Sequence, residues 1–120
     1  MIDPRNLKKE GDILNSEGTI LGLYLDRKGN LYLSSFLKDG TGIIYYTVDL
    51  VLLKDYLQSK ITLIDLYKKS SSFLVKHKFR KEIKTYLKQD FIESLQCGND
   101  NYKDIPESMK SKSIEEKYGR

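Results

Sequence analysis

The hydrophobic positions in the first half of the chain fall into three runs of strand length. They are Thr19–Leu25, Leu31–Leu37 and Ile43–Val48, all rich in aliphatic and aromatic residues. The connection between the first two runs contains Gly29, which can supply the positive φ of a bulged hairpin turn. The second connection, residues 38–42, has similar turn residues. Consecutive strands with tight connections predict a three-stranded antiparallel meander.

Both faces of this predicted sheet carry apolar side chains. Leu21, Leu23 and Leu25 alternate onto one face, whereas Ile20 and Tyr24 fall on the other. Either both faces are covered, or one face is open to a partner. We expect both to be covered, because predicted helices follow directly in the sequence.

Capping residues predict two short helices after the strands. Asp49 is a favourable N-cap for a helix that runs through Leu57 and ends near Ser59. Thr62 and Asp65 have the spacing of a capping box, in a weaker version with aspartate in place of glutamate. A second helix is therefore expected to begin at Thr62.

The stretch Lys76–Gln96 permits two interpretations. Its apolar residues recur every four positions from Phe79 to Leu95, which favours an amphipathic helix. The alternative is a hairpin in which Phe73–Lys78 pairs with Glu82–Lys88. Periodicity alone leaves both open. In either case we expect the lysines on one exposed side, namely Lys76, Lys78, Lys84 and Lys88.

The chain becomes polar after Gly98. Residues 98–120 are therefore expected to form a polar, mobile tail. Residues 1–97 would then be a single domain, in keeping with a chain of 120 residues. We predict the α+β class, with a small antiparallel sheet packed against two or three short helices.

Positive charge is concentrated in residues Lys68–Lys88, called the basic segment below. It holds eight Lys or Arg residues and one acid, a local charge of +7, whereas the whole chain has a net charge of +4. A concentrated field of one sign attracts polyanions or an acidic protein surface. The composition therefore favours a macromolecular partner.

Aromatic residues are interleaved with the cations of this segment. The candidate binding residues are Lys76, Lys78, Phe79, Arg80, Lys81, Lys84, Tyr86 and Lys88. Such an arrangement can contact phosphates and stack bases. However, the chain has no known RNA- or DNA-binding signature, and lysine reads base sequence poorly. Direct nucleic-acid binding of low specificity is therefore the alternative hypothesis.

The preferred hypothesis is docking on a larger protein or ribonucleoprotein through an acidic surface of that partner. Nine tyrosines among 120 residues is a high number, and tyrosine is enriched in interfaces because it buries a large area and keeps a polar tip. By analogy with other small, charge-polarised domains without catalytic residues, the protein would be an inhibitor of the mobile-element or phage type, that is, an anti-defence or immunity protein.

Catalytic and metal-binding chemistry is not indicated. His77 and Cys97 are the only residues of their types and lie far apart in the sequence. One histidine and one cysteine cannot form the four-ligand sites that zinc prefers. Residues 40–42 form a lone G-x-G, without the third glycine or the following Lys-Ser/Thr of a phosphate loop. We therefore predict a non-catalytic protein without cofactor or metal.

A cytoplasmic location is expected. No apolar run approaches the roughly 18 residues that a transmembrane helix needs. The first residues lack the apolar stretch of a signal peptide. The single cysteine excludes an intramolecular disulfide and fits a reducing compartment.

Three short pieces of the chain resemble a bacterial family of uncharacterised domains. They are residues 29–33, of the form G-x-L-Y-L, residues 60–65, of the form K-I-T-L-x-D, and the I-P-E turn at residues 105–107. The resemblance implies an α+β domain with a mainly antiparallel sheet and slightly favours the hairpin at Phe73–Lys88. It implies no activity, cofactor or partner.

Overall fold

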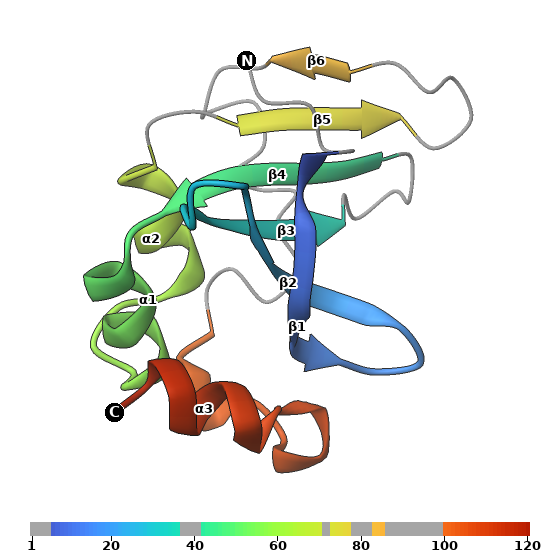
Figure 1. Ribbon diagram of the computed structural model, residues 1–120. Coiled ribbons are helices and arrows are strands. Elements are labelled where there is room, and N and C mark those ends of the chain that lie inside the picture. The colour runs from blue at the N-terminus through green and yellow to red at the C-terminus, as the bar shows by residue number, and fades with distance from the viewer. Residues whose placement is uncertain (1–5, 37–41, 71–72, 78–82, 86–99) are drawn as a thin grey trace.

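The structure is a computed structural model that describes residues 6–36, 42–70, 73–77, 83–85 and 100–120. Six strands form one antiparallel sheet in chain order: β1 (Lys8–Asn15), β2 (Thr19–Leu25), β3 (Leu31–Phe36), β4 (Gly42–Val48), β5 (Phe73–His77) and β6 (Ile83–Thr85). The helices are α1 (Leu50–Leu57), α2 (Leu63–Lys68) and α3 (Lys112–Tyr118), with the 3-10 turns η4 (Tyr102–Asp104) and η5 (Glu107–Met109). The helices gather at one side of the sheet (Figure 1). The α+β class is confirmed.

The predicted meander corresponds to β2, β3 and β4. Leu23 pairs with Leu33, and Leu33 pairs with Tyr46, so these residues share one face. All three are fully buried and belong to the core, together with Leu53 and Tyr67 from the helices. The β2–β3 turn contains a glycine with φ +86°, as its sequence predicted.

The opposite face of the sheet is also largely closed. Tyr32 and Ser34 on β3 and Tyr45 on β4 are buried there. The rings of Tyr24 and Tyr45 meet edge to face, with centroids 5.5 Å apart. Burial, with the neighbouring Tyr24 adding to its effect, raises the pKa of Tyr45 to about 12. These observations fit the expectation that both faces are covered.

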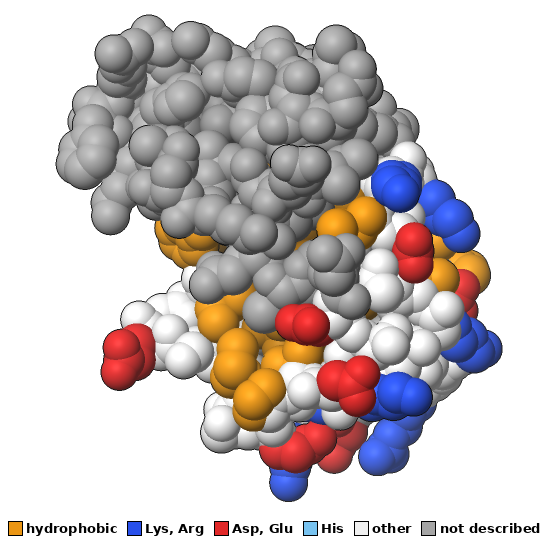
Figure 2. All heavy atoms as spheres, turned by 180° about the vertical axis from the view of Figure 1, so that it is seen from behind, with side chains coloured by type: hydrophobic (Ala, Val, Ile, Leu, Met, Phe, Trp, Pro, Cys, Tyr) orange, Lys and Arg blue, Asp and Glu red, His pale blue; other side chains and the backbone are white. Residues whose placement is uncertain are grey.

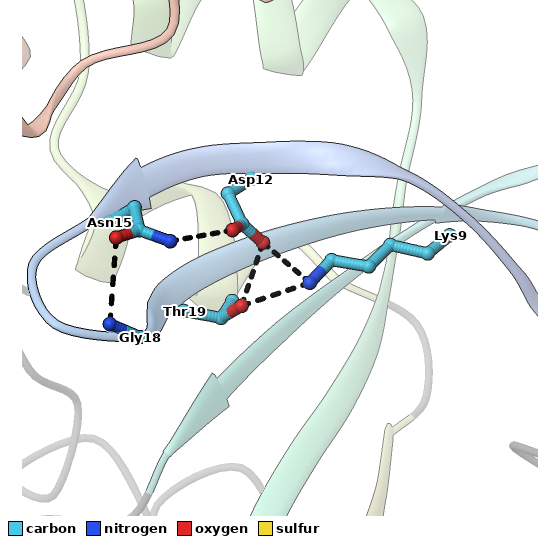
Figure 3. A network of polar contacts seen from close by, with 5 residues as sticks. All are labelled: Lys9, Asp12, Asn15, Gly18 and Thr19. Atoms are coloured by element: carbon cyan, nitrogen blue, oxygen red, sulfur yellow. Dashed lines mark hydrogen bonds and ion pairs between the residues drawn. The ribbon is translucent and has the colours of Figure 1, made fainter.

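Strand β1 was not predicted from the sequence. Its first residues are charged or glycine, and it pairs with β2 through irregular register, so it has neither strict alternation nor a continuous apolar run. Polar contacts tie the two strands together (Figure 3). Asp12 Oδ1 accepts hydrogen bonds from Thr19 Oγ1 at 2.7 Å and from Lys9 Nζ at 2.7 Å, and Asn15 Nδ2 donates to Asp12 Oδ2.

The two predicted helix starts are confirmed. Asp49 Oδ1 accepts the Leu52 amide at 2.7 Å at the start of α1. At α2, Thr62 Oγ1 accepts the Asp65 amide, and Asp65 Oδ2 accepts the Thr62 amide, which is the reciprocal capping box. The backbone hydrogen bond from Thr62 outweighs desolvation and lowers the pKa of Asp65.

Strands β5 and β6 decide between the two interpretations of the basic segment. They pair antiparallel, so the hairpin is correct and the helix is wrong for the described residues. One detail of the predicted hairpin needs correction. Val75 pairs with Lys84 and Lys76 pairs with Ile83. Paired residues share a face and neighbours along a strand alternate, so Lys76 and Lys84 belong to opposite faces. The observed faces differ from the predicted ones because the spacing of the lysines does not determine the register of the hairpin.

The predicted polar tail is instead part of the domain. Tyr102, Ile105 and Ile114 are buried in the core, and Lys110 forms a β-bridge with Leu14. The tail prediction for the described residues 100–120 is therefore wrong. Its apolar residues are isolated among polar ones, so they form no periodic pattern, and long-range contacts with β1 and α1 order them. No helix among the described residues is long and apolar enough to cross a membrane.

Candidate docking groove

Most of the candidate binding residues lie outside the described residues, namely Lys78, Phe79, Arg80, Lys81, Tyr86 and Lys88. The backbone of Lys76 is placed on β5 and that of Lys84 on β6. The start of the basic segment is described fully. Lys68 ends α2, Lys69 follows as its C-cap, and both are exposed. This part of the segment lies beside a groove.

The groove has a volume of about 770 Å³ and lies at one end of the sheet. The β2–β3 turn, the exit from β4 into α1, the end of α2 and the C-terminal residue of α3 surround it. Figure 1 shows the β2–β3 turn, the end of β4 and the helices on the same side of the molecule. Local sequence features shape three of these elements. Gly29 has the positive φ of the turn, Asp49 caps the start of α1, and Thr62 caps the start of α2.

Aliphatic side chains dominate the apolar part of the groove. They are Leu25, Leu31 and Val48 from the strands and Leu50 and Leu52 from α1. Leu50 is 57% exposed, and its neighbour Val51, which does not line the groove, is 68% exposed. The apolar surface is therefore open to solvent at the start of α1.

Most polar groups of the groove already have partners within the chain. The buried Ser70 hydroxyl donates to the Thr47 carbonyl at 2.8 Å. The Asn30 side chain donates to Asp26 Oδ2 at 3.0 Å. The Asp49 carboxylate caps α1. Lys69 is the one described lining residue with a positively charged side chain, and it is exposed.

The turn beside the groove keeps its carboxylate ionised. Desolvation alone would raise the pKa of Asp26, but hydrogen bonds from Asn30, the Lys28 amide and Tyr32 outweigh it and hold the pKa below the usual value. Arg27 and Lys28 of the same turn are exposed. The margin of the groove therefore carries cations from two elements, whereas its nearby carboxylates are occupied.

The described surface also carries carboxylates beside its cations. Figure 2 shows Lys and Arg side chains interspersed with Asp and Glu on the face seen from behind. The cluster around Asp12 is internally paired too. Desolvation would raise the pKa of Asp12, but hydrogen bonds from Lys9, Thr19 and Asn15 lower it below its usual value. We therefore assign this cluster to the stability of the β1–β2 hairpin.

Metal and catalytic sites find no support in the described part of the chain. It contains no group of three or more His, Cys, Asp or Glu residues placed to hold a metal ion. Among the described residues that line the groove there is neither His nor Cys. Its aliphatic surface and its exposed cations are suited to binding.

The groove itself was not predicted, although a sequence signal existed. Residues 50–53 are four consecutive apolar residues directly after the N-cap Asp49. A helix of 3.6 residues per turn cannot turn four consecutive side chains toward one core. The first turn of α1 also lacks the acidic residues favoured there. This excess of apolar residues predicts an exposed apolar position such as Leu50.

Comparison of the chain with protein-family models, with curated proteins and with solved structures finds no match. The resemblance to a bacterial family of uncharacterised domains stays a prediction.

Proposed function

We propose that this chain is a non-catalytic binding protein that docks on a larger protein partner. The observation that carries this proposal is the exposed aliphatic surface at Leu50, placed beside the Lys69 cation. Exposed apolar surface rimmed by polar residues is typical of protein interaction sites. The basic segment, which begins at Lys68, would supply electrostatic steering toward an acidic partner.

The groove is less suited to nucleic acid. Binding of single strands relies on aromatic side chains on which bases stack. Tyr32 and Tyr118 are the two tyrosines among the described residues that line the groove. Tyr32 is buried, and the Lys117 ammonium lies 5.4 Å from the ring centroid of Tyr118. One ring is therefore buried and the other already has a cation on one face, so direct RNA or DNA binding remains the alternative hypothesis for the basic segment.

Affinity purification from cells that encode the protein, followed by titration of the purified partner, tests the proposal. The wild-type chain should form a binary complex, and Leu50→Gln should weaken it. Val51→Gln is the matched control, because Val51 follows directly on the same helix and is exposed but does not line the groove. Sub-micromolar binding of a random RNA at about 0.15 M salt, the physiological ionic strength, would instead favour the nucleic-acid alternative.

The non-catalytic part of the proposal has its own test. The purified protein should show no turnover on phosphoester, ester, glycoside or peptide substrates. The motivation is that one histidine and one cysteine offer little for a base–nucleophile pair. A reproducible activity that His77→Ala abolishes would contradict it.

A further inference from the structure

We propose that the groove takes an acidic peptide segment of the partner, with one or two large apolar side chains inserted beside Leu50. This inference rests on the proposed function and names the chemistry of the occupant. The volume of the groove and the charges at its margin support this occupant. These charges also argue against a second copy of this chain as the occupant.

The size and lining of the groove fit apolar side chains. Its volume of about 770 Å³ lies within the range of sites that enclose a compact ligand, roughly 300–1,000 Å³. The half-buried Leu31 and Leu52 and the exposed Leu50 offer aliphatic contacts. An apolar anchor from the partner would remove this surface from water, which is the main source of binding free energy at such sites.

The cations at the margin of the groove favour acidic residues in the rest of the bound peptide. Lys69 lines the groove, Lys68 precedes it, and Arg27 and Lys28 come from the adjoining turn. Three carboxylates oppose these four cations. Asp26 accepts three hydrogen bonds from its own turn, Asp49 caps α1, and Asp65 caps α2 and attracts Lys68 and Lys69. Carboxylates on the ligand would therefore meet cations, whereas a basic ligand would meet like charge.

The same charges disfavour a second copy of this chain. In a symmetric dimer the same patch lies on both subunits, so the margins would face each other. The cations of one margin, Lys69 and those of the β2–β3 turn, would then face a margin with the same excess of cations. An acidic peptide has the complementary sign, and we therefore assign the groove to a different protein.

The test uses four sets of short fluorescent peptides of equal length and the full chain. The first set combines acidic residues with leucine or phenylalanine anchors. The other sets replace the acidic residues by lysine, replace them by glutamine, or replace the anchors by serine. Fluorescence anisotropy gives the affinities, and shifts of backbone amide NMR signals locate the site.

The acidic anchored set should bind most tightly, with shifts at Gly29, Leu50 and Ser70. Loss of the anchors should weaken binding by about tenfold or more, which corresponds to about 1.4 kcal/mol. Loss of the acidic residues should weaken it by about threefold at low salt, the scale of exposed ion pairs, and by less at high salt.

Protein variants complete the test. Leu50→Gln should weaken the acidic anchored set by about tenfold, and Val51→Gln should leave it unchanged. Lys69→Gln should weaken it by about threefold. Lys103→Gln is the matched control, because Lys103 is exposed on η4 and does not line the groove.

Several results would overturn the inference. They are equal binding of acidic and basic sets, equal losses in Leu50→Gln and Val51→Gln, and amide shifts confined to residues outside the groove. Binding of a random RNA that Leu50→Gln abolishes would assign the groove to nucleic acid. If the purified partner binds Leu50→Gln as tightly as wild type, this inference fails while the proposed function stands. If no protein partner binds the wild-type chain, both fail.

Discussion

Both ends of α1 carry apolar residues, but these residues are buried at one end and exposed at the other. At the C-terminal end, Leu53, Tyr56 and Leu57 are buried. The chain end closes over them: the Tyr56 and Tyr102 rings are in edge contact at 5.5 Å, and Gln58 Nε2 donates to the Gly119 carbonyl. We call this the closed end of α1.

At the N-terminal end, which we call the open end, Leu50 and Val51 are exposed. The capping carboxylate of Asp49 satisfies the backbone there without covering the side chains. Exposed and buried apolar side chains are thus separated along one helix of eight residues. An apolar residue of α1 therefore contributes to folding only where another element covers it.

The largest expected effect comes from removing the element that covers the closed end. A chain that stops before Asp100 loses the buried side chains of Tyr102, Ile105 and Ile114. We expect loss of cooperative unfolding in urea, followed by far-UV circular dichroism and tyrosine fluorescence. The substitution Glu116→Gln, at an exposed position of α3, is the control and should leave the transition unchanged. An unaltered transition in the truncated chain would contradict the closed-end assignment.

Leucine truncations at the two ends compare them directly. Leu53→Ala should lower the free energy of unfolding by about 2–5 kcal/mol, because Leu53 is fully buried and its loss leaves a cavity. Leu50→Ala should change it by no more than about 0.5 kcal/mol, as at other surface positions. Urea denaturation measures both. Similar losses in the two variants would remove the distinction between the ends.

Alkaline pH should weaken the closed end. Desolvation and the 2.5 Å hydrogen bond that Tyr102 donates to Glu115 Oε1 raise the pKa of Tyr102 above its usual value. As pH rises above about 10, the unfolded chain releases this proton before the folded chain does. The free energy of unfolding therefore falls above that pH.

Urea midpoints between about pH 8 and pH 11 measure this fall, starting below the pKa of about 10 for an unperturbed tyrosine. The slope should be smaller in Tyr102→Phe than in wild type, and Tyr118→Phe, at a half-buried residue outside this hydrogen bond, is the control. Parallel profiles for wild type and Tyr102→Phe would show that Tyr102 does not carry the effect.

The smallest effect concerns the open end. Asp49→Ala should cost about 1 kcal/mol of stability, the usual value for an N-cap. Asp49→Asn should cost less, because its side-chain oxygen can still accept the Leu52 amide. Chemical denaturation provides the values. An equal loss in both variants would mean that charge, and not the capping hydrogen bond, is what α1 requires.

The accuracy of sequence prediction in this chain follows the range of the interactions involved. The cap at Asp49, the capping box of Thr62 and Asp65, and the Gly29 turn connect residues close together in the chain. Their residue types are therefore visible in the sequence. Most of the candidate binding residues lie outside the described ones, so their role stays a prediction. The groove was not predicted because it combines elements distant in sequence.

By itself, then, the sequence determined the α+β class, the meander of β2 to β4, the two capped helices and the concentration of positive charge after α2. Tertiary structure decided the pairing of β1, the register that separates Lys76 from Lys84, and the packing of the last residues over α1. The physical reason is that short-range hydrogen bonds select local geometry. Burial of isolated residues such as Ile114 depends instead on which distant surface they meet.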